Sequence, residues 1–255
     1  MLATVVAIAR QAGELLRAYL DRERSMSLKG PGDLLTDADH ASEALIVEAL
    51  NRHFPDHTII AEEGSGVERE SAYAWLIDPL DGTCNYAHGF EFFSISLALI
   101  EQRTPILAVV YDPVRDLLFT AERGRGAQRN ERPIRVSAAP NLAAALVATG
   151  FPYSVATSAA NNAAEFARVQ AQAQGVRNIG SAVLELAAVA AGRLDAYWAV
   201  GLQPWDTAAS ALLIAEAGGY VSEWSGDPWN PWSSTMIASN GYIHEEMVRI
   251  LRAAD

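Results

Sequence analysis

Carboxylate side chains follow short apolar segments at three places in this sequence. Glu62-Glu63 ends one segment, Asp78 and Asp81 lie at the end of the next, and Asp206 lies at the start of a helical stretch. If these segment ends meet in the fold, the carboxylates raise one another's pKa unless cations compensate their charge. Oxygen ligands without a Cys or His cluster suit Mg²⁺, Mn²⁺ or Ca²⁺ better than zinc. The pattern therefore predicts a site for hard divalent cations.

Each acidic segment also has an ordinary structural explanation. Asp81-Gly82 is a common turn sequence, Asp206 is a suitable helix N-cap, and the acidic pair at Glu62 is typical of a solvated strand end. Their combination favours chemistry, because Asp-Pro-Leu-Asp-Gly-Thr directly follows a hydrophobic segment and begins 16 residues after Glu62. Its proline restricts the backbone between the two aspartates, and the Leu80 carbonyl is a further candidate oxygen ligand.

The elements that must position these residues are two helices followed by a largely antiparallel sheet. Apolar residues three and four apart predict a helix over residues 2–20 and a second over 41–54. In the second helix, Glu43 and Glu48 are expected to point outward. Strands are predicted at the apolar or alternating segments 58–61, 74–77, 93–100, 106–111 and 117–121.

After Pro140 the pattern changes to alternating strands and helices. Helices are predicted over 159–174, 181–191, 207–217 and 243–253, and strands over 146–148, 195–200 and 236–239. We assign the fold to the α+β class with two halves. Residues 1–138 form an α+β half with the antiparallel sheet and most candidate ligands, and residues 139–255 form an α/β half with Asp206 and the substrate pocket.

Composition and charge disfavour several classes of function. The chain has 255 residues, and its net charge of −12 disfavours binding to the phosphate backbone of nucleic acids. One Cys excludes an internal disulfide framework. No apolar stretch reaches the ~18 residues of a membrane span, and Arg10 and Glu14 interrupt the N-terminal apolar pattern, unlike in a signal peptide. We expect a cytoplasmic protein without nucleic-acid or membrane partners.

Three motifs resemble those of the inositol monophosphatase family, which belongs with fructose-1,6-bisphosphatase to the Mg²⁺-dependent, lithium-sensitive phosphatases. They are Ala61-Glu-Glu63, Trp75-Leu-Ile-Asp-Pro-Leu-Asp-Gly-Thr-Cys-Asn-Tyr86 and Pro204-Trp-Asp-Thr-Ala-Ala209. Supporting matches at residues 33–39 and 180–182 extend the resemblance over almost the whole chain. It implies a layered α/β/α/β/α sandwich of two halves, with the active site at their junction.

The resemblance also implies roles for individual residues. The family's metal positions are matched by Glu62, Asp78, Leu80 through its carbonyl, Asp81 and Asp206. The catalytic positions are matched by Asp39, Thr83 and Glu62, of which the first two orient and help deprotonate the attacking water. Backbone donors for phosphate at a helix start are matched by Gly82, Thr83 and Cys84. Substrate-pocket positions are matched by Gly180, Ser181, Ala182, Ala199 and Asp206.

Two departures from the family pattern concern substrate and phosphate binding. Ala199 stands seven residues before Asp206, where inositol-preferring members often carry a glutamate that pairs with ring hydroxyls. We therefore expect weak discrimination among polyol phosphates. Cys84 replaces the usual Thr or Ser, and this change retains the backbone donor.

The predicted activity is Mg²⁺-dependent hydrolysis of a small polyol or sugar phosphate, nominally inositol 1-phosphate. The resemblance implies two or three ions per site, with Mn²⁺ as an alternative ion, and a homodimer. Histidinol phosphate, fructose 1,6-bisphosphate and 3′-phosphoadenosine 5′-phosphate are alternative substrates within the family. A different class, a catalytically silent metal-binding regulatory protein, is disfavoured because every metal position is retained together with Thr83 and Asp39. Phosphate release with and without Mg²⁺ discriminates these classes.

Overall fold

The structure is a computed structural model, which describes residues 1–20, 26–30 and 33–252 of the chain. Its first elements are α1 (Leu2–Leu20), β1 (Met26–Gly30), β2 (Asp33–Thr36), α2 (Asp37–His53), β3 (Thr58–Ala61), β4 (Tyr73–Asp81), α3 (Thr83–Ala87), β5 (Ser94–Glu101), β6 (Thr104–Asp112), β7 (Leu117–Glu122), β8 (Ala127–Arg129) and β9 (Arg132–Pro133). The later elements are η1 (Leu142–Ala144), β10 (Leu146–Thr149), α4 (Ala163–Gln170), β11 (Gly175–Arg177), α5 (Ala182–Ala190), β12 (Ala196–Val200), α6 (Pro204–Glu216), β13 (Tyr220–Ser222), β14 (Thr235–Ser239) and α7 (His244–Arg252).

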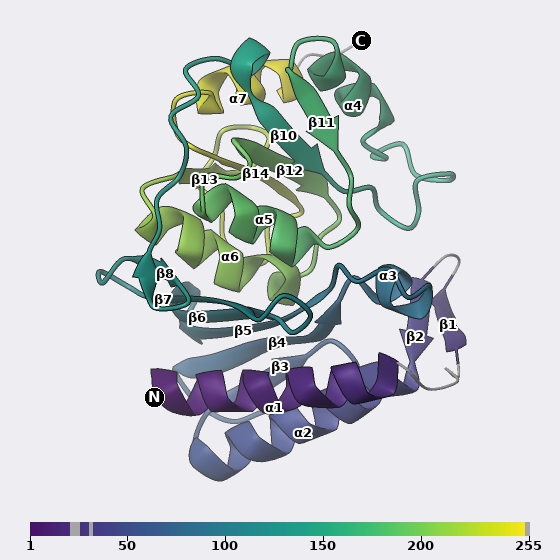
Figure 1. Cartoon of the computed structure of the whole chain (residues 1–255), viewed down its shortest axis with the longest axis vertical. Helices are drawn as coiled ribbons and strands as arrows, with labels where there is room; N and C mark the ends of the chain where they lie inside the picture. Colours follow the sequence, from purple (N-terminus) through teal and green to yellow (C-terminus); the bar gives the residue numbers. More distant parts are fainter. Residues whose placement is uncertain (21–25, 31–32, 253–255) are drawn as a thin grey trace.

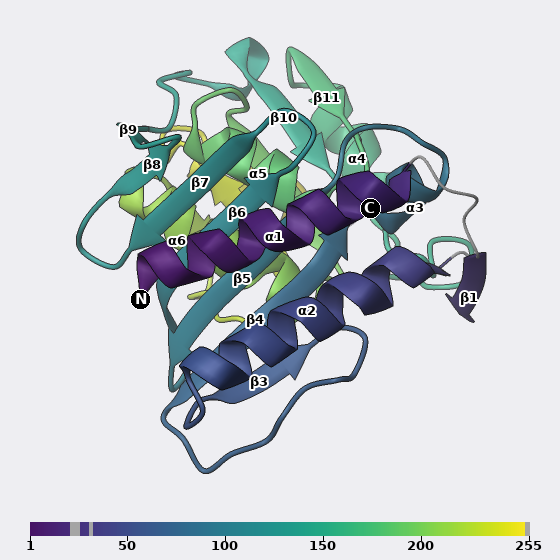
Figure 2. The same ribbon diagram turned by 60° about the horizontal axis from the view of Figure 1, so that its bottom comes forward.

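These elements form alternating layers of helix and sheet (Figure 1). Helices α1 and α2 run side by side across one face of the larger sheet (Figure 2), and α5 and α6 pack on its other face. A smaller sheet lies on α5 and α6, and α4 and α7 cover its far side. The layered α/β/α/β/α sandwich implied by the resemblance is confirmed. Within the described residues, no helix is long and apolar enough to cross a membrane.

Strand pairing agrees with the predicted change of pattern. The larger sheet has the order β3-β4-β5-β6-β7-β8-β9, in which β3 and β4 are parallel and all later pairs are antiparallel. The smaller sheet has the order β11-β10-β12-β14-β13 and mixes parallel with antiparallel pairs. The division into halves at residue 138 remains a prediction, because α5 and α6 pack on both sheets.

Strand β5 shows how the larger sheet accommodates helices on both faces. Its alternating pattern places Ile95, Leu97 and Leu99 in the apolar cluster beneath α1 and α2. The opposite face carries the small residues Ser94, Ser96 and Ala98 before Ile100, and there Ser96 Oγ donates a hydrogen bond to the Trp205 carbonyl (3.1 Å). Small side chains on this face therefore let the first turn of α6 lie close to the centre of the sheet.

Several element boundaries differ from the predicted ones. Helix α2 begins at Asp37 rather than residue 41, because Thr36 and Asp39 form a capping box. Helix α6 begins at Pro204 rather than residue 207. Helix α4 is shorter than predicted, because Asn162 adopts a left-handed conformation (φ 66°) directly before it. Strands β11 and β13 escape prediction, since three residues are too few to establish a period.

Candidate active site

The end of β4 carries two of the predicted metal ligands. Asp78 and Asp81 are buried, and a bulge between them shifts the pairing with β5 from Ser96 to Ser94. Side chains three apart on a regular strand face opposite sides, so the bulge allows both aspartates to face one region. The Leu80 N–H donates to Asp78 Oδ1 (3.0 Å) within this irregular segment.

Four predicted ligands lie close enough to affect one another. Burial raises the pKa of Asp78 well above its usual range, and the charges of Glu62, Asp81 and Asp206 raise that pKa further. Glu62 reaches this position because β3 runs parallel to β4, and the Glu62 N–H donates to the Ile77 carbonyl (3.2 Å). Repulsion among buried carboxylates favours binding of a cation between them. The structure thus brings together acidic residues that are far apart in the sequence.

The Asp81 carboxylate is also the hydrogen-bond partner of the start of α5. It accepts hydrogen bonds from Ser181 Oγ, from the N–H groups of Ala182 (3.1 Å) and Val183 (3.2 Å), and from Ser94 Oγ (3.2 Å). Burial raises the pKa of Asp81 to about 6, against the opposing effect of these hydrogen bonds. Asp81, which is itself a predicted ligand, is therefore hydrogen-bonded directly to the predicted substrate-binding residues Ser181 and Ala182.

Asp206 lies in the first turn of α6 but is not its N-cap, so the N-cap alternative is wrong. Gln203 is the N-cap, and Asp206 Oδ2 accepts a hydrogen bond from the Gln203 N–H (2.8 Å) as the acidic member of a capping box. Pro204 occupies the first turn and moves the helix start three residues before the predicted one. The helix start therefore places Asp206 close enough to Asp78 for its charge to raise the pKa of Asp78.

Asp39 and Thr83 form a buried pair beside the β4 end. Thr83 Oγ1 lies 3.0 Å from both Asp39 Oδ1 and the Leu80 carbonyl oxygen, so its single hydrogen can go to either acceptor. Asp39 Oδ2 accepts a hydrogen bond from the Thr36 N–H (2.8 Å), which fixes the carboxylate. With its hydrogen directed at Asp39, the hydroxyl oxygen keeps lone pairs that can accept a hydrogen bond from water.

The predicted phosphate-binding and substrate-binding segments adjoin each other. Gly82 has a φ of 90°, and a Cβ there would lie 3.2 Å from the Gly180 carbonyl oxygen. The segment before α5 is fixed by Asn85, whose Nδ2 donates to the Ile179 carbonyl (2.8 Å). Thr83 and Cys84 lie in the first turn of α3, where N–H groups have no partner within the helix. Their binding of phosphate remains a prediction.

Ala199 lies in the apolar cluster between the smaller sheet and the helices α5 and α6. It is 1% exposed and pairs with Met236 across β12 and β14. Its methyl group can form no hydrogen bond, as the expectation of weak discrimination requires. Contact between Ala199 and a substrate remains a prediction.

The predicted oxygen ligands suit Mg²⁺, although their carboxylates are not already arranged to enclose an ion. The described part of the chain contains no three acidic, His or Cys side chains already spaced to enclose a metal ion. Asp81 is turned toward α5 and Asp206 toward Gln203, so these two carboxylates would have to reorient. The donor set nevertheless fits a hard cation, because it is all oxygen and because repulsion around Asp78 would be relieved on binding.

Three polar residues outside the predicted site fix its segments, and the expectation for one of them is wrong. Glu43 does not point outward: it is 1% exposed and accepts hydrogen bonds from the Glu63 N–H (2.6 Å) and the Ser65 N–H (2.9 Å). Ser42 Oγ donates to the Pro79 carbonyl (2.9 Å), and Glu185 accepts from the Ile179 N–H (2.9 Å). The spacing of Ser42 and Glu43 from Asp39, three and four residues, is a signal that places them on one helix face.

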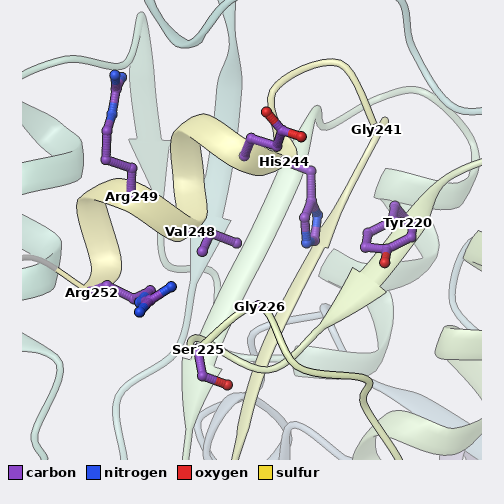
Figure 3. A pocket seen from close by; sticks show the side chains of 9 residues that line it. Tyr220, Ser225, Gly226, Gly241, His244, Val248, Arg249 and Arg252 are labelled. Atoms are coloured by element: carbon purple, nitrogen blue, oxygen red, sulfur yellow. The ribbon is translucent and has the colours of Figure 1, made fainter.

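A cavity of about 880 Å³ lies apart from these carboxylates, between α7 and the loops around β13 (Figure 3). Its lining includes Tyr220, Val248, Arg249 and Arg252 and none of the predicted site residues. His244 borders it, with its ring nitrogens hydrogen-bonded to the Ser222 and Ser239 hydroxyls (2.8 and 2.9 Å). The cavity is therefore separate from the candidate active site.

His244 is expected to reduce stability in acid. Burial lowers its pKa from 6.5 to about 4, so between these values the unfolded chain binds a proton that the folded chain does not. Stability is therefore fully present above pH 6.5 and is lost as the pH falls toward 4, by about 1–2 kcal/mol after allowance for partial solvent screening. Urea unfolding at pH 7 and pH 4.5 should show a smaller decrease for His244→Gln than for the wild type. Equal decreases would contradict the assignment.

Comparisons with known proteins agree over the full chain. A sequence profile described as the inositol monophosphatase family matches residues 1–255. An inositol-1-monophosphatase of Synechocystis sp. is 43% identical over 223 residues, covering 87% of this chain and 78% of the relative. The Nus factor SuhB of Escherichia coli K12 is 40% identical over 256 residues, covering 99% and 96%. The structure of an inositol monophosphatase from Anabaena (Nostoc) sp. PCC 7120 matches with a TM-score of 0.90 at 41% identity, covering 98% and 94%.

Proposed function

The chain belongs to the inositol monophosphatase family and is a phosphoric monoester hydrolase, and on this basis we propose that it hydrolyses a small polyol or sugar phosphate, nominally inositol 1-phosphate, with Mg²⁺. The observation that supports this proposal most is that Asp78 is buried and that the charges of Glu62, Asp81 and Asp206 raise its pKa further. These four carboxylates and the Leu80 carbonyl would hold two or three ions, with Mn²⁺ as an alternative.

The protein residues would divide the chemistry among them. When bound, the cations supply Lewis acidity toward the phosphate ester and the water. Thr83 directs its hydroxyl hydrogen at Asp39 and accepts a hydrogen bond from the attacking water. The negative charge of Asp39 favours removal of a proton from that water. Glu62 would act from the end of β3, the strand that runs parallel to β4 and pairs with it. Backbone N–H groups of Gly82, Thr83 and Cys84 would orient the phosphate, and the segment 180–182 would lie against the alcohol portion of the substrate.

The charge balance fits this assignment. A protein with a net charge of −12 repels anionic substrates and nucleic acids, but bound cations reverse the sign of the field at the site. We therefore propose small phosphorylated metabolites as substrates, no nucleic-acid partner, and a cytoplasmic location. We also propose a homodimer, for which Trp232 is a candidate contact because it is 46% exposed and lies beneath the Arg103 guanidinium (5.3 Å to the ring centroid).

A phosphate-release assay tests the proposed function. Inositol 1-phosphate, glycerol phosphate, histidinol phosphate and fructose 1,6-bisphosphate would each be incubated with enzyme in Mg²⁺ or in EDTA. We expect release only with Mg²⁺, inhibition by millimolar lithium, and kcat/KM values within about tenfold of one another, a spread of ~1.4 kcal/mol. The narrow spread follows from Ala199, which leaves no polar group unpaired when a different polyol binds.

The assay separates the alternatives. Absence of release from every ester, with cation binding intact, would favour a silent metal-binding protein over an enzyme. Preference for one ester by more than about a hundredfold (~2.7 kcal/mol) would mean that residues other than Ala199 determine the substrate specificity.

A further inference from the structure

Glu43 is a buried carboxylate that faces the backbone of the segment next to Glu62. Its Oε2 lies 2.6 Å from the Glu63 nitrogen and its Oε1 lies 2.9 Å from the Ser65 nitrogen. Burial of a carboxylate is unfavourable unless its oxygens are hydrogen-bonded. Both oxygens of Glu43 are therefore hydrogen-bonded, and they fix a segment that is distant in the sequence.

The segment that Glu43 binds is held at both ends by the sheet. The Glu62 N–H donates to the Ile77 carbonyl (3.2 Å), and Val67 exchanges two backbone hydrogen bonds with Ile59 (2.8 Å each). Between these points the chain turns away from β3. The two hydrogen bonds to Glu43 therefore help to fix the turn immediately after Glu62.

The same face of α2 contacts the other parts of the candidate site. Asp39, Ser42 and Glu43 are spaced at i, i+3 and i+4, which places them on one helical face. Asp39 accepts from Thr83, Ser42 donates to the Pro79 carbonyl, and Glu43 accepts from the turn after Glu62. One rigid helix face therefore joins the segments that carry Thr83, Asp78 and Glu62.

From this geometry we propose that Glu43 is a positioning residue, which sets the place of Glu62 relative to Asp78 and so prepares the site for a divalent cation. The inference rests on the proposed function, because it requires Glu62 to be a ligand. Glu43 itself need not touch the ion or the substrate. Groups that orient metal ligands in this way commonly change metal affinity by about 10- to 100-fold when they are replaced.

The test measures Mn²⁺ binding without substrate and hydrogen exchange of the turn. Full-length wild type, Glu43→Gln, Glu48→Gln and Glu62→Gln would be freed of metal and titrated with Mn²⁺, with free Mn²⁺ followed by electron paramagnetic resonance. Glutamine keeps the shape of Glu43 but presents an NH₂ group to one of the two N–H donors. Glu48→Gln is the matched control, because Glu48 lies on the same helix with its side chain 74% exposed.

We expect Glu43→Gln to weaken Mn²⁺ binding by about tenfold or more and to speed amide exchange in residues 62–66, while residues 94–101 of β5 exchange as in the wild type. Glu48→Gln should match the wild type in both measurements. Unchanged Mn²⁺ affinity in Glu43→Gln would overturn the inference, even if the turn became more mobile or the protein less stable, because Glu43 would then be structural only.

Glu62→Gln and one further variant, Glu43→Asp, keep the outcomes distinct. If Glu62→Gln weakens Mn²⁺ binding and Glu43→Gln does not, the inference fails and the proposed function stands. If Glu62→Gln also binds Mn²⁺ like the wild type, the ligand assignment in the proposed function fails. Should Glu43→Gln not fold, Glu43→Asp retains the carboxylate but cannot reach both amides. It should show a smaller loss of affinity in the same direction, and wild-type affinity would overturn the inference.

Discussion

Replacement of Asp78 by Asn is expected to lower kcat/KM by at least about a thousandfold, which corresponds to ~4 kcal/mol of lost transition-state stabilisation. The charges of Glu62, Asp81 and Asp206 all raise the pKa of Asp78. Asp78 is therefore near every other carboxylate of the proposed cation site. An amide at this position offers one neutral oxygen in place of a charged ligand. Steady-state kinetics in saturating Mg²⁺ measure the effect, with the exposed Asp227→Asn as control.

The same variant should be more stable than the wild type when no metal is present. The raised pKa of Asp78 means that the folded chain binds a proton more tightly than the unfolded chain. Stability is therefore lost as the pH rises above the usual value of 3.8 and through the raised pKa, and Asn abolishes this loss. Melting temperatures in EDTA at pH 5 and pH 8 should show a gain for Asp78→Asn that grows with pH. A wild type that is more stable in EDTA at both pH values would contradict the account.

Replacement of Asp39 by Asn is expected to lower kcat by about 10²- to 10⁴-fold, the usual range for general acid–base groups. Asp39 accepts the Thr83 hydroxyl hydrogen (3.0 Å) through one oxygen and the Thr36 N–H (2.8 Å) through the other. Asparagine has only one side-chain oxygen, so its NH₂ group must face either the Thr83 hydroxyl or the Thr36 N–H. The side chain can then no longer accept a hydrogen bond from that group. Mn²⁺ affinity should change much less than kcat, because Asp39 is not among the proposed ligands.

A stability measurement and a conservative variant at Thr83 separate the loss of activity in Asp39→Asn from a loss of folding. Asp39 also belongs to the capping box of α2, so its replacement should reduce stability by about 1 kcal/mol. Thr83→Ser keeps the hydroxyl group and should retain most of the activity. If Asp39→Asn keeps more than a tenth of wild-type kcat while folded, Asp39 does not act on the attacking water.

Local patterns predict the large elements and the acidic motifs well, because each depends on neighbours in the sequence. The apolar spacing of α1 and the alternation of β5 both correspond to buried faces in the structure. The three acidic motifs also lie close enough for Glu62, Asp81 and Asp206 to raise the pKa of Asp78. Two of these motifs are at strand ends in one sheet, and Asp206 is in the first turn of α6.

What local patterns miss depends on contacts between distant segments. Glu43 resembles an exposed helix residue by its spacing, yet the turn after Glu62 covers it. Asp206 has the sequence context of an N-cap, but Pro204 shifts the helix start so that Gln203 takes that place. Repulsion alone would predict that Asp81→Asn stabilises the metal-free chain. The donors at Ser181, Ala182 and Val183 oppose that gain, since an amide cannot accept from all of them.

The most direct test of the central claim is the anomalous difference density of Mn²⁺ in a crystal of the full-length protein. The account predicts peaks within about 2.0–2.6 Å of carboxylate oxygens of Glu62 and Asp78 and of the Leu80 carbonyl oxygen, with Asp81 and Asp206 reoriented toward the ions. Strong Mn²⁺ peaks elsewhere, with none between these residues at saturating Mn²⁺, would contradict it.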